Sequence, residues 1–89
     1  MAEREITITN RLGLHARPAI LFVQKASEFP CDITISKTGR KANAKSISRV
    51  LGLKVGQGDI VKIGATGEME NEAVSSLVHL LESTVMDQG

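Results

Sequence analysis

Hydrophobic and polar residues alternate along several stretches of the chain, and this pattern predicts β-strands. Within residues 5–9, isoleucine and threonine alternate, and β-branched residues in such a pattern favour a half-buried strand. Residues 31–36 and 60–65 repeat the alternation. Residues 40–44 are only weakly apolar, which favours a short strand at a sheet edge, and Thr38-Gly39 predicts the tight turn leading into it.

Three other stretches carry apolar residues at the three- and four-residue spacing of amphipathic helices. They cover residues 16–27, a short segment that begins after Ser46, and residues 70–86. Ser46 is a suitable N-cap, and Pro18 falls in a first helical turn, where no intrahelical N–H bond is lost. The expected apolar faces consist of Ala19, Phe22, Val23 and Ala26, then Ile47, Val50 and Leu51, and finally Ala73, Val74, Leu77, Leu80, Leu81 and Val85.

The expected elements follow one another in the order β-α-β-β-α-β-α. Four strands with one apolar face, and three helices to cover that face, make an α+β fold, an open-faced two-layer β-sandwich. Right-handed crossovers would place the fourth strand between the first and the second, so the antiparallel sheet is expected to have the order 1-4-2-3. The 89 residues contain no linker or repeat, and we expect one domain over residues 1–89.

Composition argues against several functional classes. The formal net charge is +1 and only Phe22 and Phe29 are aromatic, whereas a nucleic-acid binder normally has a basic excess and stacking platforms. The single Cys31 suits a reducing compartment, and with two distant histidines it gives no zinc-ligand spacing. No signal peptide, apolar stretch of about 20 residues or nucleotide-binding glycine loop occurs. We therefore expect a cytoplasmic protein without membrane insertion, metal or cofactor.

The segment from Gly13 to Ala19 concentrates the candidate chemistry, because it places His15 where a loop meets a helix. The first helical N–H groups, including those of Ala16 and Arg17, have no intrahelical acceptor and form an anion site at the positive end of the helix dipole. Arg17 can bind phosphate oxygens in a bidentate manner. An uncharged imidazole is a nucleophile for phosphorus, so these residues predict a reversible phosphate acceptor.

A less specific interpretation of each histidine stays open. A single histidine near a helix start is often a capping or surface residue, so His15 could be incidental to an α+β binding module. His79 lies inside the last predicted helix, between Val78 and Leu80, where we expect a surface or packing role.

The stretch Asn10-Arg11-Leu12-Gly13-Leu14-His15-Ala16-Arg17-Pro18-Ala19 resembles the active-site motif of the HPr family, the histidine-containing phosphocarriers of the bacterial phosphoenolpyruvate:sugar phosphotransferase system. Lys45-Ser46-Ile47 is similar to the second motif of that family, so the resemblance covers nearly the whole chain. It implies that His15 takes a phosphoryl group on Nδ1 from enzyme I, which is charged by phosphoenolpyruvate. His15 would then pass this group to enzyme II A components, with Arg17 steadying the phosphate. Such a carrier is a substrate and donor for phosphotransferases and not itself an enzyme.

The same resemblance implies docking of partners on the exposed sides of the first two helices. The candidate docking residues are Ile20, Gln24, Ile47, Arg49 and Leu51, with Lys45 at the rim. Ser46 is by position an N-cap, and in many family members this serine is phosphorylated by an ATP-dependent HPr kinase/phosphorylase as a signal of catabolite control. Nothing in the sequence requires more than a monomer.

The chain also departs from the family pattern on the side that would face its partners. Ser48 stands where Met or Phe is common, Gln24 and Ser27 stand where some members have lysine, and Lys54 replaces a frequent glycine. A smaller and more polar patch leaves two alternatives open. One is a carrier of the nitrogen-related branch of the system, and the other is a regulatory binding protein that depends on Ser46.

Overall fold

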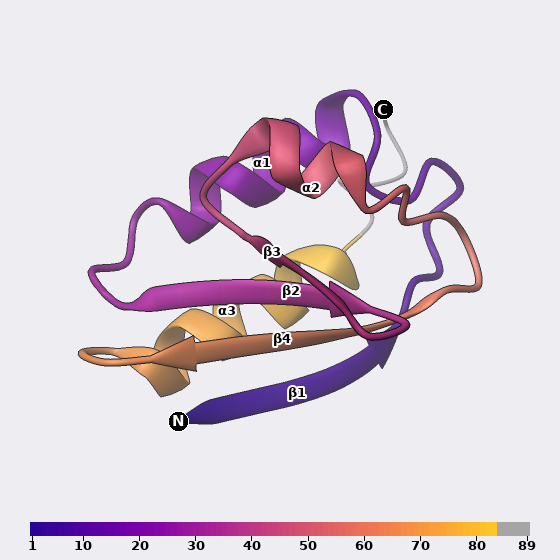
Figure 1. Ribbon diagram of the computed structural model, residues 1–89. Coiled ribbons are helices and arrows are strands. Elements are labelled where there is room, and N and C mark those ends of the chain that lie inside the picture. The colour runs from indigo at the N-terminus through magenta and orange to yellow at the C-terminus, as the bar shows by residue number, and fades with distance from the viewer. Residues whose placement is uncertain (84–89) are drawn as a thin grey trace.

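The computed structural model describes residues 1–83, in which four strands and three helices follow one another in the predicted order (Figure 1). No helix among these residues is long and apolar enough to cross a membrane. The elements are β1 (Ala2–Thr7), α1 (Arg17–Ala26), β2 (Asp32–Lys37), β3 (Arg40–Asn43), α2 (Ile47–Gly52), β4 (Ile60–Thr66) and α3 (Glu70–Leu81).

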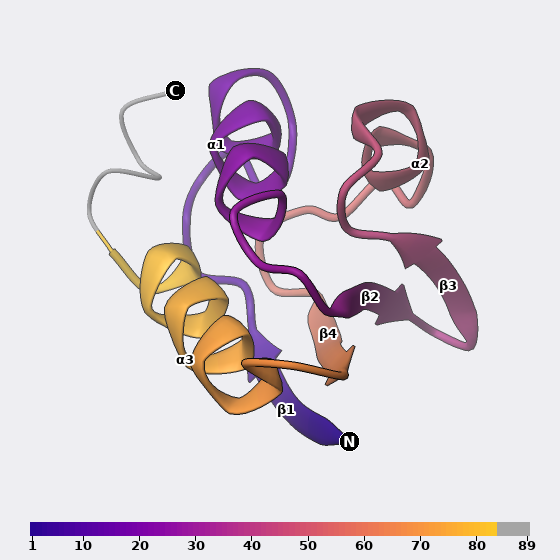
Figure 2. The same ribbon diagram turned by 90° about the vertical axis from the view of Figure 1, so that its left-hand side faces the viewer.

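The strands form one antiparallel sheet in the order β1-β4-β2-β3, which confirms the predicted topology. The register places Val61 of β4 opposite Ile6 of β1, and Ile63 of β4 opposite Ile35 of β2. Because residues at every second position point to the same side of a sheet, these pairs create one apolar face. The three helices cover that face, and the opposite face is left open (Figure 2).

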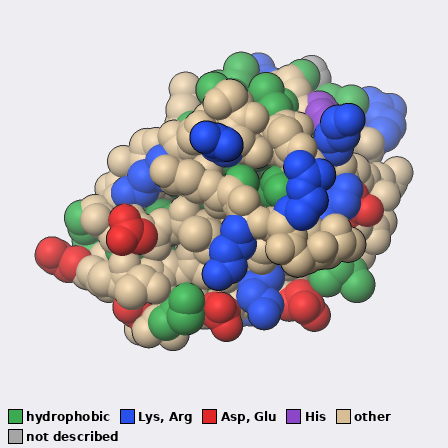
Figure 3. Space-filling view, in the orientation of Figure 1, with side chains coloured by type: hydrophobic (Ala, Val, Ile, Leu, Met, Phe, Trp, Pro, Cys, Tyr) green, Lys and Arg blue, Asp and Glu red, His purple; other side chains and the backbone are tan. Residues whose placement is uncertain are grey.

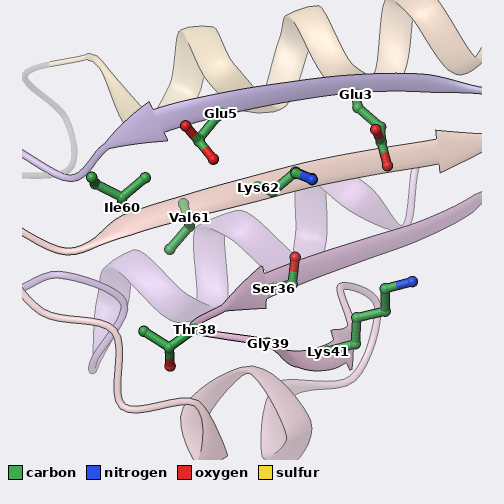
Figure 4. A pocket seen from close by; sticks show the side chains of 9 residues that line it. All are labelled: Glu3, Glu5, Ser36, Thr38, Gly39, Lys41, Ile60, Val61 and Lys62. Carbon is green, nitrogen blue, oxygen red and sulfur yellow. The ribbon is translucent and has the colours of Figure 1, made fainter.

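The open face of the sheet is polar, as Figure 4 shows. Glu3 and Glu5 of β1 and Lys62 of β4 line a shallow hollow of about 470 Å³, which extends to the turn between β2 and β3. This turn is the predicted Thr38-Gly39, and both of its residues have positive φ angles, 47° and 83°. Type I′ hairpin turns require such angles at both central positions.

The core lies between the helices and the covered face of the sheet. The helical residues buried in it are Pro18, Ala19, Phe22 and Ala26 of α1, Val50 of α2, and Ala73, Val74, Leu77, Val78 and Leu81 of α3. Of the predicted apolar face of α2, only Val50 is buried, while the side chains of Ile47 and Leu51 are 39% and 38% exposed. A helix of six residues makes less than two turns, so only Val50 faces the core.

Two predicted boundaries also differ from the structure. The first strand ends at Thr7 rather than residue 9, and Ile8 is buried just beyond it, where its N–H donates to the Asp59 carbonyl oxygen at 2.8 Å. The last helix ends at Leu81, since Glu82 and Ser83 adopt turn and bend conformations. The remainder of its predicted range, residues 84–86 with Val85, lies outside the described residues.

The loop of residues 8–16, which carries His15, lies against the loop of residues 53–59. The Leu14 N–H donates to the Val55 carbonyl oxygen at 3.0 Å. Within the 8–16 loop, the buried Asn10 closes a turn: its Nδ2 donates to the Gly13 carbonyl at 2.7 Å and its carbonyl accepts from the Gly13 N–H at 3.2 Å. The 53–59 loop is therefore the surface that holds the His15 loop in place.

Gly13 is the point of closest approach between the two loops. Its φ is +61°, and a Cβ built at this position would lie 2.2 Å from the Val55 carbonyl oxygen and 2.6 Å from the Gly56 Cα. Both atoms belong to the backbone and cannot rotate away as a side chain can. A glycine is consequently the one residue type that fits between them.

Lys37, the last residue of β2, joins both ends of the 53–59 loop. Its Nζ donates to the Lys54 carbonyl oxygen at 2.8 Å and forms an ion pair with Asp59 Oδ2, also at 2.8 Å. The same Oδ2 accepts the Gly56 N–H at 2.8 Å. The hydrogen bond from Lys37 and the one from Gly56 lower the pKa of the Asp59 carboxyl below its ordinary value.

We expect Gly13→Ala to destabilise the fold by roughly 2–4 kcal/mol, because a positive φ is unfavourable for alanine and the added methyl group overlaps the Val55 carbonyl. Urea unfolding followed by circular dichroism measures the loss. Gly39→Ala is the matched control, since Gly39 has a φ of +83° with nothing within 4 Å of the added Cβ. Equal losses in the two variants would show that the contact with Val55 is unimportant.

We expect the stabilisation contributed by Asp59 to be lost as the pH falls. Its pKa is lower in the folded than in the unfolded protein, so its contribution is present above the unfolded pKa and disappears on acidification through the folded pKa. Asp59→Asn should therefore melt at a lower temperature than the parent protein near neutral pH, and this difference should shrink as the pH falls below the ordinary pKa of an aspartate carboxyl. Thermal unfolding across this pH range measures the difference, and a difference that stays constant with pH would contradict the assignment.

Candidate functional site

His15 lies on the surface immediately before α1. It is exposed, Ala16 is the N-cap residue, and α1 begins at Arg17 with Pro18 in its first turn. This confirms the predicted position beside the N-cap. Among residues 1–83, no side chain or backbone group forms a hydrogen bond with the imidazole. Because the ring is exposed, another protein can approach its nitrogen atoms.

The backbone of Ala16 is held in an unusual conformation. Its φ and ψ are 54° and −132°, a combination that residues other than glycine rarely adopt. Such strain is found at functional sites, where the surrounding structure holds it in place. Here the N-terminus of α1 holds one side of Ala16, because the Ala16 carbonyl accepts the Ile20 N–H at 3.3 Å. The 8–16 loop, held by its contact with Val55, fixes the other side.

The beginning of α1 presents N–H groups that have no helical acceptor. The N–H groups of Ala16, Arg17 and Ala19 form no hydrogen bond within the part of the chain that is described, and Pro18 has none to donate. The sequence predicts the first two of these groups, whereas the third is identified only from the structure. The first turn contains no acidic side chain that would offset the positive end of the helix dipole. An anion beside His15 would be favoured here.

Basic side chains surround this end of the molecule. Figure 3 shows Lys and Arg side chains gathered on the face that carries α2, with a histidine exposed among them. Arg17 and Arg49 are both exposed. Apart from Glu28, Asp32 and Asp59, every acidic residue lies outside residues 11–62. The formal net charge of the whole chain is only +1, yet its basic side chains are concentrated on one face.

The predicted docking residues lie on the exposed sides of α1 and α2, which pack against each other. The side chain of Ile20 is 49% exposed, and Ile47 and Leu51 are the other exposed apolar residues of the two helices. Gln24 and Arg49 are exposed as well. Lys45, expected at the polar rim, is partly buried, and its Nζ donates to the Phe29 carbonyl oxygen at 2.6 Å. The role of this surface in docking stays a prediction.

Ser46 is the N-cap residue of α2, as predicted, but its side chain does not cap the helix. Its Oγ lies 3.3 Å from the Oγ of the exposed Ser48, where either hydroxyl can donate. The Ser46 hydroxyl is therefore not engaged by the helix N-terminus. Lys54 has a φ of 55°, which explains why glycine would suit this position.

The other residues with possible chemistry lie elsewhere. His79 is exposed on α3 and lines a shallow hollow with Lys25 and Ser76, which agrees with the expected surface role. Cys31 is buried and not part of a disulfide. Within residues 1–83, no group of three His, Cys, Asp or Glu side chains could hold a metal ion.

Comparison with known proteins identifies the family. Residues 2–83 match the family model described as the PTS HPr component phosphorylation site. The phosphocarrier protein HPr of Xylella fastidiosa (strain Temecula1) is 43% identical over 83 residues, which are 93% of each chain.

Two solved structures extend the comparison. A crystal structure of HPr from Thermoanaerobacter tengcongensis superposes with a TM-score of 0.93 at 48% identity, covering 100% of this chain and 98% of the other. A crystal structure of Crh, the Bacillus subtilis catabolite repression protein, superposes with a TM-score of 0.74 at 40% identity, covering 92% and 94%. That Crh structure is described as an intertwined dimer formed by a swapped domain.

The matches span nearly the whole chain, and the observed sheet order and three-helix layer agree with the fold expected for this family. The chain therefore belongs to the HPr family, the phosphocarriers of the phosphotransferase system.

Proposed function

We propose that this protein carries a phosphoryl group on Nδ1 of His15 from enzyme I, which is charged by phosphoenolpyruvate, to enzyme II A components of the sugar phosphotransferase system. The observation that supports this most directly is the position of His15. It is an exposed imidazole placed just before α1, and within residues 1–83 neither the ring nor the first N–H groups of that helix have a hydrogen-bond partner.

The transfer requires an uncharged imidazole. The lone pair of Nδ1 attacks phosphorus, the P–N bond forms, and the bond from phosphorus to the donor breaks with its electron pair leaving on the donor. The free N–H groups at the start of α1 and the Arg17 guanidinium would then bind the phosphoryl oxygens. In the second transfer, a nucleophile of the acceptor attacks the same phosphorus and the electron pair of the P–N bond returns to Nδ1.

An exposed site suits a carrier better than an enzyme. A carrier must present the same phosphorus atom to a donor and then to an acceptor, and each of these partners has to approach the ring. His15, Ala16 and Arg17 are all exposed, which permits this approach. We propose that the partners dock over Ile20, Ile47 and Leu51, and that acidic groups on their surfaces favour the basic face around α2.

A regulatory role at Ser46 is the second candidate. It is supported by the Ser46 hydroxyl, which the helix does not engage, and by the similarity to Crh, a catabolite repression protein. A phosphate on Ser46 would bring two negative charges onto the docking surface and repel acidic partners. Carriage on His15 and modification of Ser46 are compatible in one molecule. For the carrier role of His15, a carrier of the nitrogen-related branch is the alternative. The expected monomeric state contrasts with the dimer described for Crh.

We expect the protein to gain roughly 80 Da when it is incubated with enzyme I and phosphoenolpyruvate, and to lose this mass in acid, as a phosphohistidine does. His15→Ala should gain none, and His79→Ala should gain as much as the parent protein. Intact-mass spectrometry measures the adduct with enzyme I of the sugar branch and of the nitrogen branch, which also distinguishes the two. If no adduct forms with either enzyme I, the proposed carrier function is wrong.

We expect HPr kinase and ATP to add a phosphate to Ser46 that is stable in acid. Ser46→Ala should abolish this modification and leave uptake on His15 intact, whereas Ser48→Ala should retain it. Peptide mapping by mass spectrometry locates the phosphate, and a phosphate on Ser48, or none at all, would contradict the regulatory role.

A further inference from the structure

The His15 loop, residues 8–16, is held in position by the loop of residues 53–59. Residues 8–16 contain no helix or strand, and the backbone hydrogen bond that ties Leu14 to the rest of the fold ends on Val55. Other bonds cross the same boundary nearer to β1: the Ile8 N–H donates to the Asp59 carbonyl and the Gly58 N–H donates to the Ile8 carbonyl, both at 2.8 Å, and Gln57 Nε2 donates to the Thr9 carbonyl at 3.1 Å. A displacement of the 53–59 loop would therefore displace the residue that precedes His15.

The 53–59 loop is itself irregular and needs support. Lys54 has a left-handed backbone with a φ of 55°, and Gly58 has a φ of 90°. Such a backbone is unfavourable for lysine and persists only where the surroundings maintain it. The carbonyl of Lys54 accepts a hydrogen bond from Lys37, and Asp59 at the other end of the loop binds the same ammonium group.

This arrangement links a regular strand to the His15 loop in three steps. Lys37 ends β2, which is paired with both β3 and β4. Its Nζ spans the loop from Lys54 to Asp59, and Asp59 Oδ2 also holds the Gly56 N–H. Val55, between these anchored residues, then accepts the Leu14 N–H and meets Gly13.

We propose that Lys37 and Asp59 are positioning residues for phosphoryl transfer by His15, a role that rests on the proposed carrier function. They act through the 53–59 loop by holding Val55 where it supports the His15 loop. Neither residue forms a hydrogen bond or ion pair with His15 among the described residues.

The sensitivity of group transfer to geometry makes such support important. A displacement of about 1 Å in a reacting group lowers the rate of transfer by up to two orders of magnitude. An ion pair that is partly exposed, as the Lys37 and Asp59 side chains are, contributes little to overall stability. Loss of the bridge should thus reduce phosphoryl transfer far more than it reduces the fraction of folded protein.

Lys37→Met and Asp59→Asn test the proposal together, because they change the net charge in opposite directions. With the carrier as the varied substrate of enzyme I, we expect both variants to lower kcat about five- to tenfold and to change KM less than twofold. We expect Lys37→Arg, which can form both contacts, to restore most of kcat. Ile33→Val, a core change at the other end of β2, is the control for a general loss of stability and should keep kcat unchanged.

Two-dimensional ¹H–¹⁵N NMR of the unphosphorylated variants gives a readout that does not depend on transfer. We expect the amide signals of residues 13–17 to shift in Lys37→Met and in Asp59→Asn, and to stay unchanged in Ile33→Val. If the parent protein takes up no phosphate, the carrier function fails, while unshifted amide signals would overturn the positioning role.

Two further outcomes would also overturn the positioning role. Opposite changes in KM at constant kcat would mean that the two charges act on the partner and not on the loop. An equal loss of kcat in Ile33→Val would mean that the effect is one of general stability.

Discussion

The contact between Gly13 and the Val55 carbonyl fixes the loop of residues 8–16, which carries His15, against the loop of residues 53–59. It joins two irregular loops that are far apart in sequence, and it leaves no room for a side chain at residue 13. The Leu14 N–H donates a hydrogen bond to the same carbonyl, which also fixes the orientation of the two loops at this contact. Because His15 is the next residue, this carbonyl is the anchor that lies nearest to the imidazole on the N-terminal side.

The site that results combines an exposed ring with a constrained backbone. Ala16 has a conformation that a residue with a side chain rarely adopts, yet the chain on both sides of it is anchored, by Val55 before it and by α1 after it. Among the residues that the structure describes, the first N–H groups of α1 have no acceptor, and they follow directly after His15 in the chain. Backbone geometry thus supplies the N–H groups of the anion site that we propose, with Arg17 as its charged neighbour.

The two faces of the sheet have separate roles in this design. One face packs against three helices and supplies the rigid support on which α1 and the two loops rest (Figures 1 and 2). The other face is polar and lies on the opposite side of the sheet from the helices (Figure 4). The residues that we propose as functional are found at the helical layer and at the loops beside it, where Lys and Arg side chains also gather (Figure 3).

The sequence alone was sufficient for the sheet order and for the position of His15. Period-two alternation with buried Ile33, Ile35, Val61 and Ile63 marks two strands, and crossover handedness then places β4 between β1 and β2. The proximity of His15 to a helix start followed from local spacing, which depends on neighbouring residues only. The six-residue α2 was less predictable, because three apolar residues in so short a helix do not show which of them will be buried.

Only the tertiary structure determined how the site is held. Lys37, Val55 and Asp59 have no shared pattern in the sequence, and their importance arises from contacts between segments that are distant along the chain: Lys37 with Lys54 and Asp59, and Val55 with Leu14. The strain at Ala16 and the free Ala19 N–H depend likewise on the angle at which the chain enters α1. Local sequence sets propensity and periodicity, whereas these features depend on long-range packing, which places chemically ordinary residues against one another.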